Sequence, residues 1–352
     1  MLVEKGMPLY LIGLGLGSKG YLTLKALEIM KRSDKIYLDS YTSFIDRDLL
    51  DELRKSFEEK IVEADRRLLE EGSSSIVEEA EKMNVCILVP GDPLIATTHL
   101  SIILEAARKG VKSEIVYGIS AYSALISASC LQAYKFGKTV TIPKSGVGIE
   151  SCYRSIVENM ERGLHTLVLL DTADGGLEIP AAIRMLSRAE EKLGMGLISE
   201  RRLLVCLARI GFSDEFKWAG PLAQALKTSY PPPPHSIIFP GSLHFSEAEA
   251  LKKILEADPE TVDSHLPLRY SWSRVSKYIS SVESVLNTLE ILEDSSELRE
   301  TLSLAKSYLE DSQRFQSEGK IFDALAAISY AEGLLDGLRL LGKVEFSWRK
   351  RG

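Results

Sequence analysis

The sequence contains few cysteines, no long apolar run and no excess of basic charge. Its four cysteines form no C-x-x-C pair and three of them lie in apolar runs, so we expect reduced thiols in the core and no metal site. No window reaches the ~18 apolar residues of a membrane-spanning helix, and the N-terminus lacks the basic and apolar regions of a signal peptide. A net charge of −7 argues against a basic surface for nucleic acid. We expect a cytoplasmic protein that acts on proteins or small molecules, with no membrane contact and no direct nucleic-acid partner.

The alternation of apolar and amphipathic stretches predicts an α/β domain at residues 1–118. At 352 residues the chain is too long for one typical domain. Short apolar runs alternate with stretches of helical periodicity, a pattern typical of a mostly parallel sheet covered on both faces. The expected strands lie at 8–14, 35–38, 60–62, 85–89 and 113–117, and the expected helices at about 24–30, 46–57 and 98–109. The charged run 64–83 predicts a solvated helix that breaks at residues 72–75.

The alternation continues in a second predicted α/β domain, residues 119–257. Its expected strands lie at 139–143, 163–171, 203–211 and 236–239, and its helices follow Ser120 and span 151–162, 178–193 and 246–256. Residues 258–270 are polar and contain proline, which predicts a linker. In the last part, 271–352, apolar residues recur at spacings of three and four. This spacing predicts helices at 271–293, 296–317 and 321–341, arranged as an antiparallel hairpin or bundle.

A glycine motif near the N-terminus is compatible with a dinucleotide-binding enzyme. Gly15, Gly17 and Gly20 fit the pattern G-x-G-x-x-G between a predicted strand and a predicted helix, and Asp39 follows about 20 residues later. A nicotinamide-dependent oxidoreductase is therefore one hypothesis. The same glycines also fit a strand and a helix that merely pack closely together.

The decapeptide PGDPLIATTH at residues 90–99 directly follows the buried strand predicted at 85–89. The prolines lack an amide proton and Gly91 permits a positive φ, so the chain must turn sharply at the carboxyl end of this strand. Open α/β sheets bind their ligands at that edge. The whole decapeptide resembles the S-adenosylmethionine loop of the diphthine synthases, which belong to the tetrapyrrole-methylase type of methyltransferase.

Further blocks resemble the same family, so that the resemblance covers residues 8–257. They are GLGLG at 13–17, LDSYTS at 38–43, YKFGK at 134–138, GLHTLVLLD at 163–171 and PPHSIIFPG at 233–241. The resemblance implies two α/β domains with S-adenosylmethionine in the cleft between them, in a homodimer. It also implies an activity: successive methylation of the amino group of a 3-amino-3-carboxypropyl-histidine in translation elongation factor 2, which gives diphthine and S-adenosylhomocysteine.

The resemblance also implies which residues hold the cofactor. They are Leu16, Asp92, Ile95, Ser120, Ala121, Leu170, Ile210 and His235. The family commonly has Pro-Ser-Ile around Ser120, so Ile119 and Ala121 depart from its pattern. Methyl transfer from a sulfonium needs alignment more than a catalytic triad, and the sequence names no proton acceptor. Asp92 is expected to position the cofactor, and His99 is expected to have no role beyond beginning a helix.

Three alternatives remain beside this interpretation. An enzyme of the same fold can methylate a corrinoid precursor or ribosomal RNA, the glycine motif allows a nicotinamide enzyme, and a binding protein without catalysis is the third. The segment beyond residue 257 exceeds the ordinary length of diphthine synthases. Its run 323–336 resembles a small archaeal helical family of unknown function, and we expect it to serve interaction or dimerisation. The basic residues at 349–351 are expected to form a frayed end.

Overall fold

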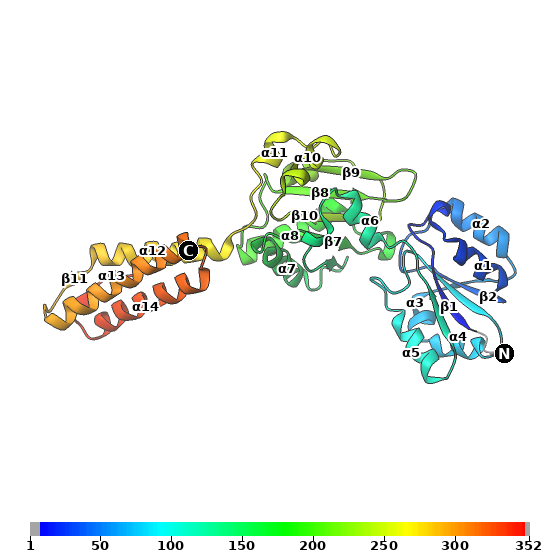
Figure 1. The fold of residues 1–352 in the computed structure, drawn as a ribbon, viewed down its shortest axis with the longest axis horizontal. Helices are drawn as coiled ribbons and strands as arrows, with labels where there is room; N and C mark the ends of the chain where they lie inside the picture. The colour runs from blue at the N-terminus through cyan, green and yellow to red at the C-terminus, as the bar shows by residue number, and fades with distance from the viewer. Residues whose placement is uncertain (1–7, 349–352) are drawn as a thin grey trace. The chain divides into compact units, whose positions relative to one another are not determined.

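The computed structural model describes residues 8–348, and the chain divides into two compact units, with the boundary between residues 268 and 269 (Figure 1). The first unit contains two α/β lobes and the second is helical, as the sequence predicts. The boundary between the lobes at residues 118 and 119 stays a prediction. The basic end from Arg349 lies outside the described residues.

The N-terminal lobe is built on a five-stranded parallel sheet with the order β3-β2-β4-β1-β5. Its strands are β1 (Leu9–Gly13), β2 (Lys35–Asp39), β3 (Ile61–Ala64), β4 (Val85–Val89) and β5 (Ser113–Val116). Alternate side chains of the strands enter two separate apolar clusters, one with Leu9 and Leu11 and the other with Ile12. Both faces are therefore covered, as expected for a parallel sheet.

Five α-helices cover this sheet: α1 (Leu24–Arg32), α2 (Arg47–Phe57), α3 (Arg66–Glu70), α4 (Ser73–Ala80) and α5 (Leu100–Arg108). The prediction of one solvated helix at 64–83 is wrong in part. Gly72 does separate two helices, but the serines that follow it form the first turn of α4. Ile76 and Val77 of α4 are fully buried, because its charged residues occupy the opposite face.

The C-terminal lobe has a mixed sheet with the order β6-β7-β10-β8-β9. Only β6 and β7 are parallel, and the other pairs are antiparallel. The strands are β6 (Val140–Ile142), β7 (Thr166–Leu170), β8 (Leu203–Ala208), β9 (Phe216–Pro221) and β10 (His235–Phe239). The sequence did not predict β9, because its alternation is short and ends in Gly220 and Pro221. Pairing with the buried strand β8 nevertheless holds it in the sheet.

The helices of this lobe are α6 (Ala121–Ala128), α7 (Ile149–Glu161), α8 (Ile179–Leu193), α9 (Leu222–Ala225), α10 (Phe245–Lys253) and α11 (Pro259–Asp263). Helix α11 lies in the stretch 258–270 that was expected to be a linker. Its Val262 is buried in the core of the lobe. Beyond it, the carbonyl of Leu266 accepts a 3.0 Å hydrogen bond from Arg202. This stretch therefore packs on the lobe as far as Leu266.

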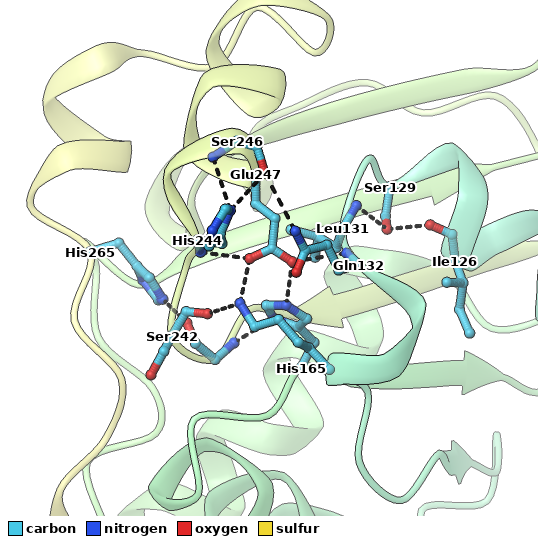
Figure 2. Close-up of polar contacts among 12 residues, drawn as sticks. Ile126, Ser129, Leu131, Gln132, His165, Ser242, His244, Ser246, Glu247 and His265 are labelled. Atoms are coloured by element: carbon cyan, nitrogen blue, oxygen red, sulfur yellow. Dashed lines mark hydrogen bonds and ion pairs between the residues drawn. The ribbon is translucent and has the colours of Figure 1, made fainter.

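A buried ionic cluster lies between the start of β7 and helix α10 in the C-terminal lobe (Figure 2). Glu247 accepts hydrogen bonds from the backbone amides of Gln132 (2.8 Å) and His244 (2.7 Å) and pairs with Lys135 and with His165 (3.0 Å). Burial alone would raise the pKa of Glu247, but the bonds from His244, Lys135 and Gln132 lower it to about 2. The family-like block at 134–138 thus supplies Lys135, which pairs with a residue 112 positions away.

The second unit contains α12 (Tyr270–Thr288), α13 (Ser296–Ser317) and α14 (Ile321–Leu340), which pack on one another around a shared apolar core. The predicted bounds of α13 are confirmed. Helix α12 ends before the predicted residue 293, because Glu290–Ile291 form a strand, β11, that pairs with β12 (Val344–Glu345). No helix within residues 8–348 is long and apolar enough to span a bilayer.

Candidate active site

Four glycines let the backbone cross closely at the carboxyl edge of the parallel sheet. Gly91, after β4, exchanges backbone hydrogen bonds of 2.8 and 3.1 Å with Gly15, after β1. A Cβ on Gly118 would lie 2.2 Å from the carbonyl oxygen of Gly91, and a Cβ on Gly13 would lie 2.6 Å from the same oxygen. Only glycine fits at these two positions. The crossing brings the ends of β1, β4 and β5 together under one cavity.

This cavity is lined from both lobes, and it brings together seven of the eight residues predicted to hold a cofactor. The seven are Leu16, Ile95, Ser120, Ala121, Leu170, Ile210 and His235. They come from the loops after β1 and β4, the start of α6, the ends of β7 and β8 and the start of β10. Segments up to 219 residues apart in sequence, from Leu16 to His235, therefore line one cavity.

Asp92, the eighth residue, does not line the cavity. Its carboxylate accepts hydrogen bonds from the amide of Leu94 (3.0 Å) and the amide of Gly118 (3.3 Å), and the side chain is 5% exposed. It ties the loop after β4 to the loop after β5. Its position indicates that it shapes the wall of the cavity and does not face it.

His235 and Ser120 line the cavity while their polar atoms serve the protein itself. The His235 ring accepts a 3.2 Å bond at Nδ1 from the amide of Ile179 and donates from Nε2 to the carbonyl of Pro231 at 2.6 Å. Burial lowers the pKa of His235, which favours the neutral ring. The Ser120 hydroxyl accepts from the amide of Tyr122 and caps α6, as predicted. The His235 ring therefore offers the cavity mainly its apolar surface, whereas the Ser120 hydroxyl can still donate its own proton to a ligand.

Sequence reasoning missed several residues of the cavity, notably Thr42, Asp171, Thr172 and Arg209. The hydroxyl of Thr172 donates a 3.0 Å bond to the carbonyl of Thr42, which joins the two lobes. Arg209 has a left-handed backbone with φ of 53°, a strained conformation that is typical of functional sites. The signal for Asp171 was available: it directly follows a buried strand, at the edge where such sheets bind ligands.

A second, wider cavity of about 820 Å³ adjoins the first. The two share Thr42, Ser43, Phe44, Ala96, Thr141, Asp171 and Thr172 as lining residues. The wider cavity adds charged side chains, namely Arg66, Glu70 and Asp174. A narrower, largely apolar space and a wider, charged one thus meet at Asp171.

Asp39 and His99 form a buried pair in the N-terminal lobe. The side chains are 0% and 1% exposed, and Nε2 of His99 lies 3.2 Å from the Asp39 carboxylate. The other oxygen of that carboxylate accepts from the amides of Tyr41 and Thr42. His99 therefore does more than begin a helix, because it faces the carboxylate that fixes the loop at residues 41–42. Asp39 is inaccessible to a ribose, which argues against a nicotinamide site built on the glycine motif.

Comparison with known proteins gives matches along most of the chain. The family of tetrapyrrole (corrin/porphyrin) methylases matches residues 8–226, and a family described as protein of unknown function (DUF357) matches residues 277–344. The diphthine synthase of Staphylothermus marinus is 42% identical over 76% of this chain and 98% of its own length. That of Saccharolobus solfataricus is 40% identical over 71% of this chain and 99% of its own. A crystal structure of a diphthine synthase has a TM-score of 0.65 at 32% identity, covering 72% of this chain and 98% of the other.

Proposed function

The chain is a methyltransferase of the tetrapyrrole methylases, in the diphthine synthase family, and on this premise we propose its cofactor and substrate. The cofactor is S-adenosylmethionine. The acceptor is the amino group of a 3-amino-3-carboxypropyl-histidine in translation elongation factor 2, methylated to diphthine in diphthamide biosynthesis. The observation that supports this most is the 42% identity over 98% of a diphthine synthase, with seven family-implied cofactor residues around one cavity.

The residues of the first cavity fit S-adenosylmethionine. Its walls include the apolar side chains of Leu16, Ile95, Leu170 and Ile210, which suit an adenine ring and the carbon chains attached to the sulfonium. The start of α6 at Ser120 and Ala121 presents backbone groups to the same space. The glycine crossing leaves room for a ligand to approach backbone, because Gly91 has open space where a Cβ would stand. When bound, the cofactor supplies an electrophilic methyl group.

The protein's part in the reaction is to align the acceptor with the cofactor and to keep water away from them. An amine attacks the methyl carbon in line with the breaking bond to sulfur, so the distance and angle between acceptor and cofactor decide the rate. The apolar side chains around the narrower cavity displace water from the surface of a bound ligand. Asp171 places a negative charge where the two cavities meet. Because the wider cavity is open to solvent, water can accept the proton of the amine.

We also propose that the enzyme acts as a homodimer. Support comes from apolar side chains that the single chain leaves exposed on α5 and in the segment after β5: Leu100 (55% exposed), Leu104 (50%), Tyr117 (71%) and Ile119 (43%). Burial of such side chains is the usual driving force of association. Light scattering of the purified protein measures its molar mass in solution. The mass of a monomer at micromolar concentration contradicts the proposed homodimer.

The experiment that tests the function is an incubation with methyl-labelled S-adenosylmethionine and elongation factor 2 that carries the aminocarboxypropyl histidine. Intact mass is expected to rise in methyl steps, and only on the modified factor. Factor without the aminocarboxypropyl group is the control. Binding of S-adenosylhomocysteine without any transfer would overturn the proposed acceptor and favour a corrinoid or ribosomal RNA. Absence of binding would overturn the cofactor.

A further inference from the structure

We propose that the wider cavity binds the amino-acid head of the acceptor, with Arg66 paired to its carboxylate and Asp171 paired to its ammonium group. This inference rests on the proposed function, because it takes the acceptor to be an aminocarboxypropyl group. Such a group carries one positive and one negative charge next to each other at neutral pH. The site must therefore offer one charge of each sign, beside the cofactor.

The wider cavity is the one that adjoins the cofactor. It shares lining residues with the narrower cavity, among them Thr42 and Asp171, so a group held in one reaches the other directly. Asp171 directly follows Leu170, which lines only the narrower cavity. A nitrogen bound at Asp171 would thus lie where the two cavities join, within reach of a methyl group held in the narrower cavity. The openness to solvent suits an acceptor that is attached to a large protein.

Arg66 supplies the positive charge in this cavity. It lies on α3, and its Nε donates to both carboxylate oxygens of Glu70 at 3.1 Å. These bonds use Nε, so the two terminal amino groups of Arg66 remain to bind a carboxylate in the two-pronged geometry that guanidinium favours. Glu70 is itself held by the hydroxyl of Thr98 at 3.0 Å. Glu70 and Thr98 therefore act as positioning residues for Arg66.

Asp171 supplies a fixed negative charge. Its two carboxylate oxygens accept backbone hydrogen bonds from Lys144 (2.9 Å) and Ala173 (3.0 Å). These bonds lower the pKa of Asp171, so that it stays ionised at neutral pH. Each oxygen can accept a further bond, and the side chain lines both cavities. An ionised carboxylate in this place attracts the ammonium group and holds its nitrogen.

The chemical step balances with water as the proton carrier. The ammonium group first loses a proton to water in the open cavity, which frees the lone pair of nitrogen. That lone pair forms the bond to the methyl carbon while the carbon–sulfur bond breaks and its electron pair goes to sulfur. Each such transfer replaces a proton on nitrogen by a methyl group. A carboxylate with a lowered pKa suits this role, because it binds the ammonium group without retaining the proton.

The test uses Arg66→Gln, with Arg67→Gln as the matched control. Arg67 is the next residue of α3 and also pairs with a glutamate four positions on, Glu71, but it lies outside the wider cavity. Initial rates are measured on the modified elongation factor over a range of its concentrations, and S-adenosylhomocysteine binding is measured by calorimetry. For Arg66→Gln we expect kcat/KM for the factor to fall roughly ten- to hundredfold, mainly through KM, as is typical for loss of one charged hydrogen bond.

For Arg66→Lys we expect a kcat/KM between those of the wild type and Arg66→Gln, since lysine keeps the positive charge and cannot form the second hydrogen bond to the carboxylate. Binding of S-adenosylhomocysteine should stay within about twofold in every variant, because Arg66 does not line the narrower cavity. Equal kcat/KM for Arg66→Gln and Arg67→Gln overturns the inference while the function stands. A wild-type enzyme that binds S-adenosylhomocysteine and methylates no modified factor overturns the proposed function and this inference with it.

Discussion

The two ends of strand β7 lie in opposite electrostatic surroundings. At its start, His165 and Glu247 belong to a buried cluster in which both carboxylate oxygens of Glu247 have partners from the protein. At its other end, Asp171 has two backbone partners and faces open cavities. A carboxylate whose partners all come from the chain stabilises the fold, whereas one that faces a cavity is available to a ligand. The difference separates stability from function within one strand.

The largest expected effect is on stability, from Glu247→Gln. The substitution leaves Lys135 without its buried counter-ion, and breaking such a pair typically costs about 3 kcal/mol. Denaturant unfolding followed by circular dichroism is the measurement, with the exposed Glu249→Gln on the same helix as the control. Activity of the folded fraction at low temperature should be unchanged. Equal stability of the two variants contradicts the structural role of the cluster.

Acid should weaken the same end of the strand. The pKa of Glu247 is about 2 in the folded protein against an ordinary value of 4.5, so this group is depressed by folding. Its contribution is therefore fully present above about pH 5 and is lost as the pH falls toward 2, and amounts to about 3 kcal/mol. The free energy of unfolding of the wild type should fall more steeply over this range than that of Glu247→Gln. Parallel curves rule out this contribution.

At the end of β7 that faces the cavities, substitution of Asp171 is expected to lower kcat/KM. Asp171→Asn keeps one oxygen acceptor for the backbone and removes the negative charge. We expect kcat/KM for the modified elongation factor to fall roughly ten- to hundredfold, with the free energy of unfolding changed by about 1 kcal/mol or less. Asp263→Asn is the control, because this carboxylate of α11 is exposed and pairs only with Lys252 among the ion pairs of the described residues. If Asp171→Asn lowers the free energy of unfolding as much as Glu247→Gln does, the two ends of β7 do not differ in the way proposed.

The smallest effect is expected at His235, whose polar atoms serve the protein. In His235→Asn an oxygen can still accept from the amide of Ile179, while ring surface at the cavity is lost. We expect S-adenosylhomocysteine to bind roughly fivefold more weakly, which corresponds to about 1 kcal/mol of apolar contact. Calorimetry at pH 6 and pH 8 measures it. A wild-type affinity that changes strongly between these pH values contradicts a neutral His235.

The sequence predicted regular elements and apolar positions better than contacts between distant residues. Strand β4 follows from a continuous apolar run and helix α13 from helical periodicity, and both signals are local. Helix α11 and strand β9 were missed because each is short and is held by packing on the rest of its lobe. Lys135 and Glu247 stand 112 residues apart, and nothing local to either indicates the pair.

The candidate site shows the same limit. The resemblance named the apolar wall, including Leu170 and Ile210, because these residues belong to continuous blocks. It did not name Thr42 or Arg209, whose place at the cavity depends on a contact between lobes and on a strained backbone. It predicts Asp92 at the cofactor, which stays a prediction; the carboxylate is absent from the cavity lining and accepts a hydrogen bond from the amide of Gly118. Orientation of a side chain follows from the folded loop, and a motif alone does not fix it.

The glycine crossing limits how this enzyme can evolve. Every single-nucleotide change that replaces a glycine introduces a Cβ atom, and at Gly118 that atom would collide with the backbone oxygen of Gly91. Single substitutions at Gly118 are therefore not tolerated without a shift of the backbone under the cavity. Ala121, which follows Ser120 and lines the cavity, carries a side chain already and is free of this restriction. A lineage that alters its ligand preference is expected to accumulate changes there, while the crossing remains as it is.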